Sequence, residues 1–305
     1  MVYMADASFC FDSEWIFAKF ADVMKNLITR AMTGAIYVGL IIAGILLGNV
    51  AFLALSCLLA GLALNEFCQL TKSGTHAGIA TSLTDLAGGL ILVTGVNQFV
   101  WALGKGYSFP LLTLWGGLYL IYFIARLVMQ LYRRDERPLA SLAVSMMGQM
   151  YIALPISLMS LIYYSEGGKA LTLGMFVMIW LNDTGAYLVG SRIGRRRLFE
   201  RISPKKSWEG FFGGVVFAVG AGFLYRYGFA DYFDHRSWAV MAGYGLVVAV
   251  FATWGDLVES LLKRTLGVKD SGNLLPGHGG ILDRIDSLLM VIPATVVYLC
   301  CLRLF

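Results

Sequence analysis

Residues 31–65 have the sequence AMTGAIYVGLIIAGILLGNVAFLALSCLLAGLALN, in which no Asp, Glu, Lys or Arg occurs. A single helix needs only ~20 apolar residues to cross the hydrocarbon core of a bilayer. The stretch is therefore long enough for two spans, and Gly48-Asn49 near its middle is a typical turn signal. We predict a helical hairpin with helices at about 31–48 and 50–66.

The same criterion identifies further apolar segments along the chain. Because these segments are long and continuous rather than alternating, helices are the expected spanning element. The fold predicted is an all-α, polytopic membrane helical bundle of about nine transmembrane helices. The remaining predicted spans are 78–96, 108–126, 139–163, 171–190, 210–228, 238–258 and 287–304.

The composition agrees with a membrane protein. Apolar residues make up 58% of the chain and charged residues 14%, whereas soluble domains average ~45–50% and ~25%. The five cysteines have neither metal-ligand spacing nor the pattern of a disulfide framework, and there are only three histidines. Redox chemistry and structural zinc are therefore not expected.

Basic residues are unevenly distributed between the predicted loops. With nine spans and a cytoplasmic N-terminus, the inside segments hold 19 of the 24 Lys and Arg residues. Lys and Arg are enriched in cytoplasmic loops, so we expect these segments inside and Phe305 outside. The inside segments are 1–30, 67–77, 126–137, 191–208 and 259–286.

The N-terminal segment does not have the order of a signal peptide, because the first long apolar run begins only after Arg30. Apolar residues in its second half recur at helical spacing, which predicts an interfacial helix or an ordinary amphipathic lead-in. The expected organisation has three parts. They are an N-terminal interfacial segment (1–30), N-terminal transmembrane helices (31–163) and a C-terminal catalytic transmembrane region (171–305).

One predicted inside loop, 191–208, is unusually basic, with seven Lys and Arg residues. Ser207 can cap the helix that follows, and Lys205 and Lys206 stand just before it. A helix N-terminus flanked by lysines attracts phosphate, so we predict an anion site here. The upstream arginines at 195–197 fit a lipid-headgroup patch equally well.

The loop at 259–286 mixes acidic, basic and glycine residues. Asp283 and Asp286 are three residues apart, so both carboxylates lie on one face if the ninth helix starts near them. Like charges this close repel each other unless a cation lies between them, and oxygen ligands suit magnesium. We therefore expect a Mg²⁺ site near these two residues.

A glycine-rich stretch, PGHGG at 276–280, lies next to those carboxylates. Its backbone amides can approach a phosphate closely, and nearby basic residues would add charge. The pair Glu259 and Lys263 has i, i+4 spacing, and a structural ion pair is as good an explanation as a direct role. The basic residues near this stretch are Lys263, Arg264, Lys269 and Arg284.

Two acids fall within predicted spans or at their ends. Asp183 lies inside the span 171–190, and Asp256 lies near the end of the span 238–258. An ionisable group at membrane depth costs at least ~2.5–3.5 kcal/mol, so each should face a wet cavity, a cation or a partner. Interhelical hydrogen bonding is the alternative for Asp183, and the sequence assigns no role to Asp85.

The run from Ser260 to Asp286 has the pattern SxxKRx₄KDxGxxLPxHGGxxDRxD. This pattern resembles the signature of the phosphatidate cytidylyltransferases, the CDP-diacylglycerol synthases. The resemblance extends upstream to Asn182-Asp183, Ser203-Pro204-Lys205-Lys206 and Gly255-Asp256, so it covers most of the C-terminal half. The N-terminal half is similar only in being a series of spans.

The resemblance implies an enzyme that transfers the cytidylyl group of CTP to phosphatidic acid, releasing pyrophosphate and leaving CDP-diacylglycerol, with Mg²⁺ as cofactor. The resemblance implies a role for each residue of this chain that stands at a matching position of the family's motifs. The implied metal ligands are Asp256, Asp283, Asp286 and Asp183. The implied catalytic residues are Asp256, Asp283, Asp286, Lys205 and Lys269. The implied substrate-binding residues are Asn182, Ser203, Lys205, Lys206, Lys263, Arg264, Lys269, His278, Gly279, Gly280 and Arg284.

The expected partners are CTP, phosphatidic acid and the lipid bilayer, with no nucleic acid and with either a monomer or a homodimer. The expected location is the inner (plasma) membrane, as a multi-pass protein whose active site faces the cytoplasm. Two other functions are compatible with parts of the pattern. One is a CTP-dependent kinase of a polyprenol or related lipid alcohol, and the other is a cation-coupled transporter that uses the intramembrane acids.

Overall fold

The computed structural model describes residues 19, 24, 29, 31–75, 78–106, 108–228, 237–272, 274 and 279–302. Within these residues, eight helices are long and apolar enough to cross a membrane, and the helix Ala31–Leu46 is apolar but shorter. The nine helices follow the order of the nine predicted spans, which confirms the all-α membrane bundle. The predicted interfacial helix at 1–30 lies outside the described residues, apart from three isolated positions.

The helices that follow Ala31–Leu46 are labelled in chain order. The long ones are α2 (Asn49–Thr75), α3 (Ile79–Leu103), α4 (Ser108–Leu131), α7 (Gly168–Ile193), α8 (Trp208–Gly228), α10 (Trp238–Thr265) and α11 (Leu282–Cys301). Between α4 and α7, one span is built from α5 (Pro138–Gly148), the π-helical turn η1 (Gln149–Ala153) and α6 (Leu154–Tyr164).

Local residue chemistry explains several helix ends. Gly48, with φ of 109°, separates the first two helices, as the turn signal predicted. Pro138 occupies the first turn of α5, where its missing N–H costs nothing. Ser237 caps α10 by accepting a hydrogen bond from the Val240 N–H at 3.3 Å.

Several helices extend beyond the apolar runs that predicted them. Helix α10 continues to Thr265 and α11 begins at Leu282, so the predicted loop 259–286 is shorter than expected. Charged residues interrupt an apolar run without ending a helix, because their side chains can turn toward protein instead of lipid. Glu259 on α10 is fully buried in this way, and Glu66 near the end of α2 is 6% exposed.

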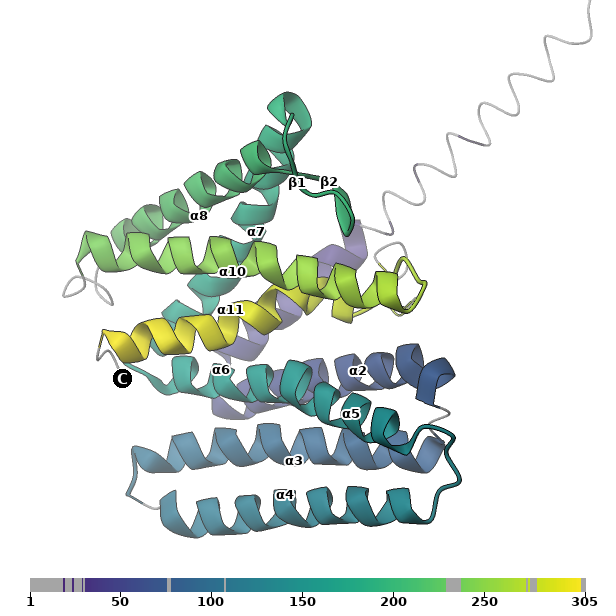
Figure 1. The fold of residues 1–305 in the computed structure, drawn as a ribbon. Helices are drawn as coiled ribbons and strands as arrows, with labels where there is room; N and C mark the ends of the chain where they lie inside the picture. Colours follow the sequence, from purple (N-terminus) through teal and green to yellow (C-terminus); the bar gives the residue numbers. More distant parts are fainter. Residues whose placement is uncertain are drawn as a thin grey trace, which may run out of the picture.

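The helices stack in layers, with α6 and α11 in the middle of the bundle (Figure 1). Helix α11 packs against α10 on one side and α6 on the other, and α7 packs along α8. The hairpin of α3 and α4 lies at the opposite edge, where α4 is largely exposed. The fully buried Ile152, Ile285 and Ile292 lie in the core that joins these layers.

A short β-hairpin interrupts the helical fold between α7 and α8. Its strands β1 (Arg197–Phe199) and β2 (Ser203–Ser207) are antiparallel, with Phe199 opposite Ser203. The sequence predicts a loop here, because three- and five-residue strands carry little periodic signal. The predicted cap at Ser207 is confirmed, since its Oγ accepts a hydrogen bond from the Gly210 N–H at 3.1 Å.

The connections α2–α3, α4–α5, α7–α8 and α10–α11 all lie at one end of the bundle, on the right in Figure 1. These connections correspond to the four basic inside segments that follow the N-terminal one. The structure thus groups the basic loops as the topology prediction requires. Which end faces the cytoplasm stays a prediction.

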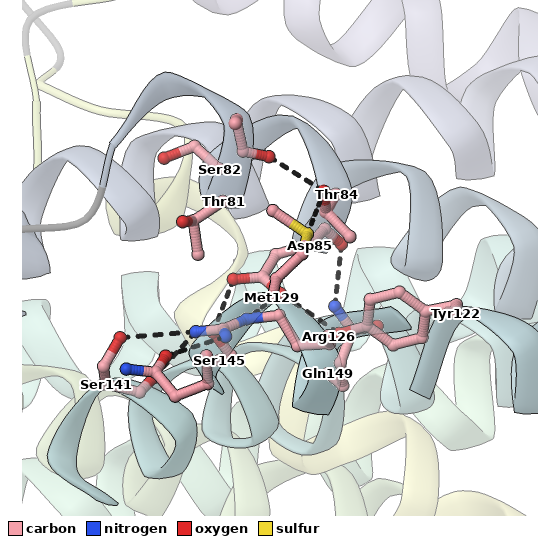
Figure 2. Close-up of polar contacts among 12 residues, drawn as sticks. Thr81, Ser82, Thr84, Asp85, Tyr122, Arg126, Met129, Ser141, Ser145 and Gln149 are labelled. Carbon is pink, nitrogen blue, oxygen red and sulfur yellow. Dashed lines mark hydrogen bonds and ion pairs between the residues drawn. The ribbon is translucent and has the colours of Figure 1, made fainter. Parts of the chain in front are cut away.

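A buried polar cluster joins α3 to α4 and α5 (Figure 2). Arg126 Nε lies 3.3 Å from Asp85 Oδ1, and the two side chains are 0% and 7% exposed. Ser145 Oγ donates to Asp85 Oδ2 at 2.5 Å, and the Tyr122 hydroxyl donates to Oδ1 at 3.2 Å. Placing Arg126 in the inside segment 126–137 was therefore wrong, because α4 continues past it and its charge is paired inside the protein.

Candidate functional site

Three carboxylates meet where α10 passes the start of α11. One oxygen each from Asp256, Glu259 and Asp286 lie within 4.8 Å of one another. Asp256 and Glu259 are three residues apart on α10, so they share a helix face. For Glu259 the sequence left a structural pair with Lys263 and a direct role equally open and did not name it as a metal ligand, although its spacing from Asp256 equals that between Asp283 and Asp286.

Gly255 allows this meeting of the two helices. A Cβ atom at Gly255 would lie 2.5 Å from the Asp286 carbonyl oxygen and 2.8 Å from Ser287 Cα. Contacts this short with backbone atoms would push α11 away from α10. The absence of a side chain at Gly255 thus sets the distance between Asp256 and Asp286.

Lys206 connects the β-hairpin to this group. Its Nζ lies 2.6 Å from Asp256 Oδ2, while Ser260 Oγ donates to Oδ1 of the same carboxylate at 3.2 Å. Asp256 is partly exposed, so an incoming ligand can reach it. The predicted anion-binding lysine and a predicted metal ligand are therefore neighbours.

Lys263 bridges two acids on different helices. Its Nζ lies 2.5 Å from Glu259 Oε2 and 2.6 Å from Asp283 Oδ1. The predicted Glu259–Lys263 pair is thus confirmed. Asp283 Oδ2 accepts hydrogen bonds from the Gly280 N–H at 2.9 Å and the Ser271 N–H at 3.0 Å, so Asp283 lies outside the three-carboxylate group.

A cavity of about 260 Å³ opens beside these residues, between the helix Ala31–Leu46, α7 and α11. One part of its wall is polar and includes Asp183, Arg284, Asp283 and Asp286. The rest of the wall is largely apolar. Its apolar residues include Val38, Phe176, Ile179, Trp180 and Leu288.

The other predicted residues lie around this centre. Asn182 is buried on α7, and Ser203 lies on β2. Gly279 has φ of 83°, a conformation that favours glycine, and the Gly280 N–H is bound to Asp283. Lys205, Arg264 and Lys269 are exposed around the edge of the site, and His278 lies outside the described residues.

The described part of the site carries an excess of negative charge. Lys206 and Lys263 each contact two acidic or carbonyl groups and offset only part of it. Carboxylate oxygens that converge without full neutralisation favour a hard divalent cation. The donor set of Asp256, Glu259 and Asp286 therefore fits magnesium.

The chain is similar to known proteins over almost its whole length. The model of a family described as "Cytidylyltransferase family" matches residues 28–302. The phosphatidate cytidylyltransferase of Bacillus subtilis (strain 168) is 33% identical over 274 residues, which are 89% of this chain and 96% of the relative. The matched region therefore includes both the N-terminal helices and the carboxylate site.

Shorter matches with higher sequence identity involve staphylococcal proteins. The phosphatidate cytidylyltransferase of Staphylococcus aureus (strain COL) is 48% identical over 118 residues, 39% of this chain and 44% of the relative. That of Staphylococcus epidermidis (strain ATCC 12228 / FDA PCI 1200) is 45% identical over 129 residues, 42% of this chain and 48% of the relative. This chain thus spans less than half the length of these staphylococcal relatives.

Proposed function

Because the chain belongs to the cytidylyltransferase family, we propose that it transfers the cytidylyl group of CTP to phosphatidic acid. The products are CDP-diacylglycerol and pyrophosphate. The observation that carries the proposal is the convergence of Asp256, Glu259 and Asp286 beside Lys206, next to a cavity with a polar part and an apolar part. Such a site accepts a phosphate group attached to an apolar body.

The cavity wall suits the lipid substrate. Acyl chains can lie against Phe176, Trp180 and Leu288, while the phosphate lies toward Arg284. Arginine binds phosphate through several N–H groups and keeps its charge at all physiological pH values. The Arg284 side chain is exposed and lines the cavity, within reach of a phosphate bound there.

Basic residues at the edge of the site suit the triphosphate of CTP. Lys206 lies in the site itself, and Lys205 and Lys269 are exposed near it on β2 and in the α10–α11 loop. Charge-assisted hydrogen bonds from lysine are worth ~1.5–3 kcal/mol each. These residues would hold CTP with its α-phosphorus facing the lipid phosphate.

Asp256, Glu259 and Asp286 are the residues that would hold Mg²⁺, with Asp283 and Asp183 beside them on the cavity wall. Bound there, the cation would offset negative charge on the phosphate oxygens. Lys263 holds Asp283 in place and balances its charge, so Asp283 orients the first turn of α11.

In the reaction, an oxygen of the lipid phosphate forms a bond to the α-phosphorus of CTP. The bond from that phosphorus to the oxygen bridging to the β-phosphate breaks, and its electron pair leaves with pyrophosphate. The lipid phosphate is already ionised near pH 7, so no protein base is required. The protein's contribution is to position two anionic groups and to reduce their mutual repulsion.

We infer a cytoplasmic location for the site, in the plasma membrane. The support is that the carboxylates lie on the second half of α10 and the first turns of α11, near the end of the bundle that holds the basic loops, and basic loops favour the cytoplasmic side. CTP is a cytoplasmic metabolite and would reach the site from that side. A homodimer is compatible with the exposed apolar surface of α4, which equally suits lipid.

The test uses purified protein in detergent with phosphatidic acid, Mg²⁺ and CTP labelled at either the α- or the γ-phosphate. We expect α-label in the lipid product and γ-label in pyrophosphate. Asp286→Asn and Asp256→Asn should reduce turnover at least a hundredfold, and Arg196→Ala, an exposed residue before the hairpin, should have little effect.

The alternatives give different results in the same assay. A lipid kinase would place γ-label in the lipid and release CDP. A cation-coupled transporter would not turn over CTP at all. Normal turnover by Asp286→Asn at normal Mg²⁺ concentration would refute the proposed metal site.

A further inference from the structure

Glu66 lies near the C-terminal end of α2, far in sequence from every motif of the site, and is 6% exposed. Its Oε2 accepts a hydrogen bond from the Ile281 N–H at 2.9 Å, and its Oε1 accepts one from the Leu282 N–H at 3.1 Å. Ser271 Oγ donates a short hydrogen bond to the same Oε1. The carboxylate is therefore surrounded by donors from the α10–α11 loop and the start of α11.

These hydrogen bonds supply the N-terminal cap that α11 does not obtain from its own N-cap residue. The residue at its N-cap position, Ile281, has no side chain that can accept a hydrogen bond. The first N–H groups of a helix have no partner within the helix. Glu66 accepts from two of them, and Ser271 Oγ accepts from the Asp283 N–H at 3.2 Å. A negative charge at this end also favours the helix dipole.

The contacts continue from Glu66 to the carboxylate group. Ser271 binds Glu66 through its hydroxyl and Asp283 through its backbone N–H. Asp283 binds Lys263, and Lys263 binds Glu259. A continuous series of hydrogen bonds and ion pairs thus links α2 to the residues that would hold the cation.

Two glycines of the C-terminal motif make room for Glu66. A Cβ atom at Gly272 would lie 2.8 Å from Glu66 Oε2, and one at Gly280 would overlap both Glu66 Oε1 and Ser271 Oγ. Gly280 was predicted to bind phosphate through its backbone. Its N–H is instead bound to Asp283 Oδ2, and the space where a side chain would stand is filled by Glu66.

We infer that Glu66 is a positioning residue of the site. It fixes the α10–α11 loop and the first turn of α11, so that Asp283 faces Lys263 and Asp286 faces Asp256. The inference rests on the proposed function only in treating those carboxylates as the reactive centre. The capping of α11 by a residue of α2 can be tested without any assay of activity.

The decisive variant is Glu66→Gln in the full-length enzyme. Both carboxylate oxygens of Glu66 face N–H donors, so a glutamine of the same size must place its NH₂ against one of them. We expect backbone amides in peptides covering residues 279–285 to exchange with deuterium about tenfold faster, the scale of one lost charge-assisted hydrogen bond. We expect kcat to fall by a similar factor or more, with little change in KM for CTP.

The matched control is Glu136→Gln, which makes the same chemical change at an exposed residue between α4 and α5. It should change neither measurement. Glu66→Asp, which keeps the charge, should retain more activity than Glu66→Gln. If Glu66→Gln is not recovered folded, Ser271→Ala tests the same series of contacts and should increase exchange in the same peptides.

Unchanged exchange at 279–285 in both Glu66→Gln and Ser271→Ala would overturn the inference whatever their activity. Faster exchange with normal kcat would show that Glu66 caps α11 without positioning the site, which also overturns it. If the wild-type protein transfers no cytidylyl group, the proposed function fails, and the exchange experiment still decides whether Glu66 holds α11.

Discussion

Single residues determine how closely the chemical groups of the site approach one another. Gly255 has no side chain that would separate α10 from α11, and the absence of a side chain at Gly280 leaves space for Glu66. Gly280 belongs to the glycine-rich stretch predicted to bind phosphate, and Gly255 precedes Asp256, a predicted metal ligand. In the structure they act through close packing, and this brings Asp256 and Asp286 together.

Gly255→Ala should therefore impair the site. A methyl group 2.5 Å from the Asp286 carbonyl must displace α11, and overpacking of this kind typically costs ~1–3 kcal/mol. We expect a lower thermal transition and a larger loss of turnover, measured on the purified protein. Gly220→Ala is the matched control, because open space surrounds that position on α8. Wild-type turnover in Gly255→Ala would contradict the packing argument.

At the scale of helices and strands, polar contacts between α3, α4 and α5 fix the outer hairpin of the bundle. Asp85 binds Arg126 and Ser145, and Gln149 Nε2 donates to the Asp85 carbonyl at 2.8 Å (Figure 2). Arg126 also donates to Gln130 Oε1 at 3.0 Å. Each nitrogen of the fully buried guanidinium thus has at least one acceptor, which allows a charge to remain within an apolar span.

Asp85→Asn should destabilise the protein, because it leaves the Arg126 charge buried without a counter-ion. Removal of one partner from a buried pair costs ~3–5 kcal/mol. The double variant Asp85→Leu with Arg126→Leu should be less destabilised than Asp85→Asn, since no uncompensated charge remains. Thermal unfolding in detergent measures both, with Glu136→Gln as an exposed control. Equal stability of Asp85→Asn and the wild type would contradict this account.

At the scale of the whole molecule, the bundle separates two kinds of connection. Those that carry the basic residues and the β-hairpin lie at one end, and α3–α4 and α6–α7 lie at the opposite end (Figure 1). The carboxylate site lies close to the basic end, where α10 passes the start of α11. The described chain has nine apolar helices in series. If all nine cross the membrane, the two ends of the series lie on opposite sides.

Reporter fusions test this topology. A fusion after residue 135, between α4 and α5, should report a cytoplasmic location, and a fusion after Phe305 should report the opposite side. The reason is the distribution of Lys and Arg between the two sets of connections. A cytoplasmic signal from both fusions would mean that one of the five helices between the two fusion points, from Pro138–Tyr164 to Leu282–Cys301, does not cross the bilayer.

The sequence by itself determined the membrane class, the order of the nine helices, the turn at Gly48 and the region that contains the site. Hydropathy, turn preference and capping act between residues that are near in the chain, so a linear pattern records them. The cap at Ser207 and the pair Glu259–Lys263 are of this local kind, and the structure contains both.

Only the tertiary structure decided which distant groups meet. Glu66 is more than two hundred residues from Ile281, and Asp85 is sixty residues from Ser145, so no spacing rule could connect them. The same holds for Lys206 with Asp256 and for Asp256 with Asp286, whose contacts depend on how the β-hairpin, α10 and α11 pack. Burial in an apolar environment makes each charged group require a partner, and the packing of the helices determines which partner is within reach.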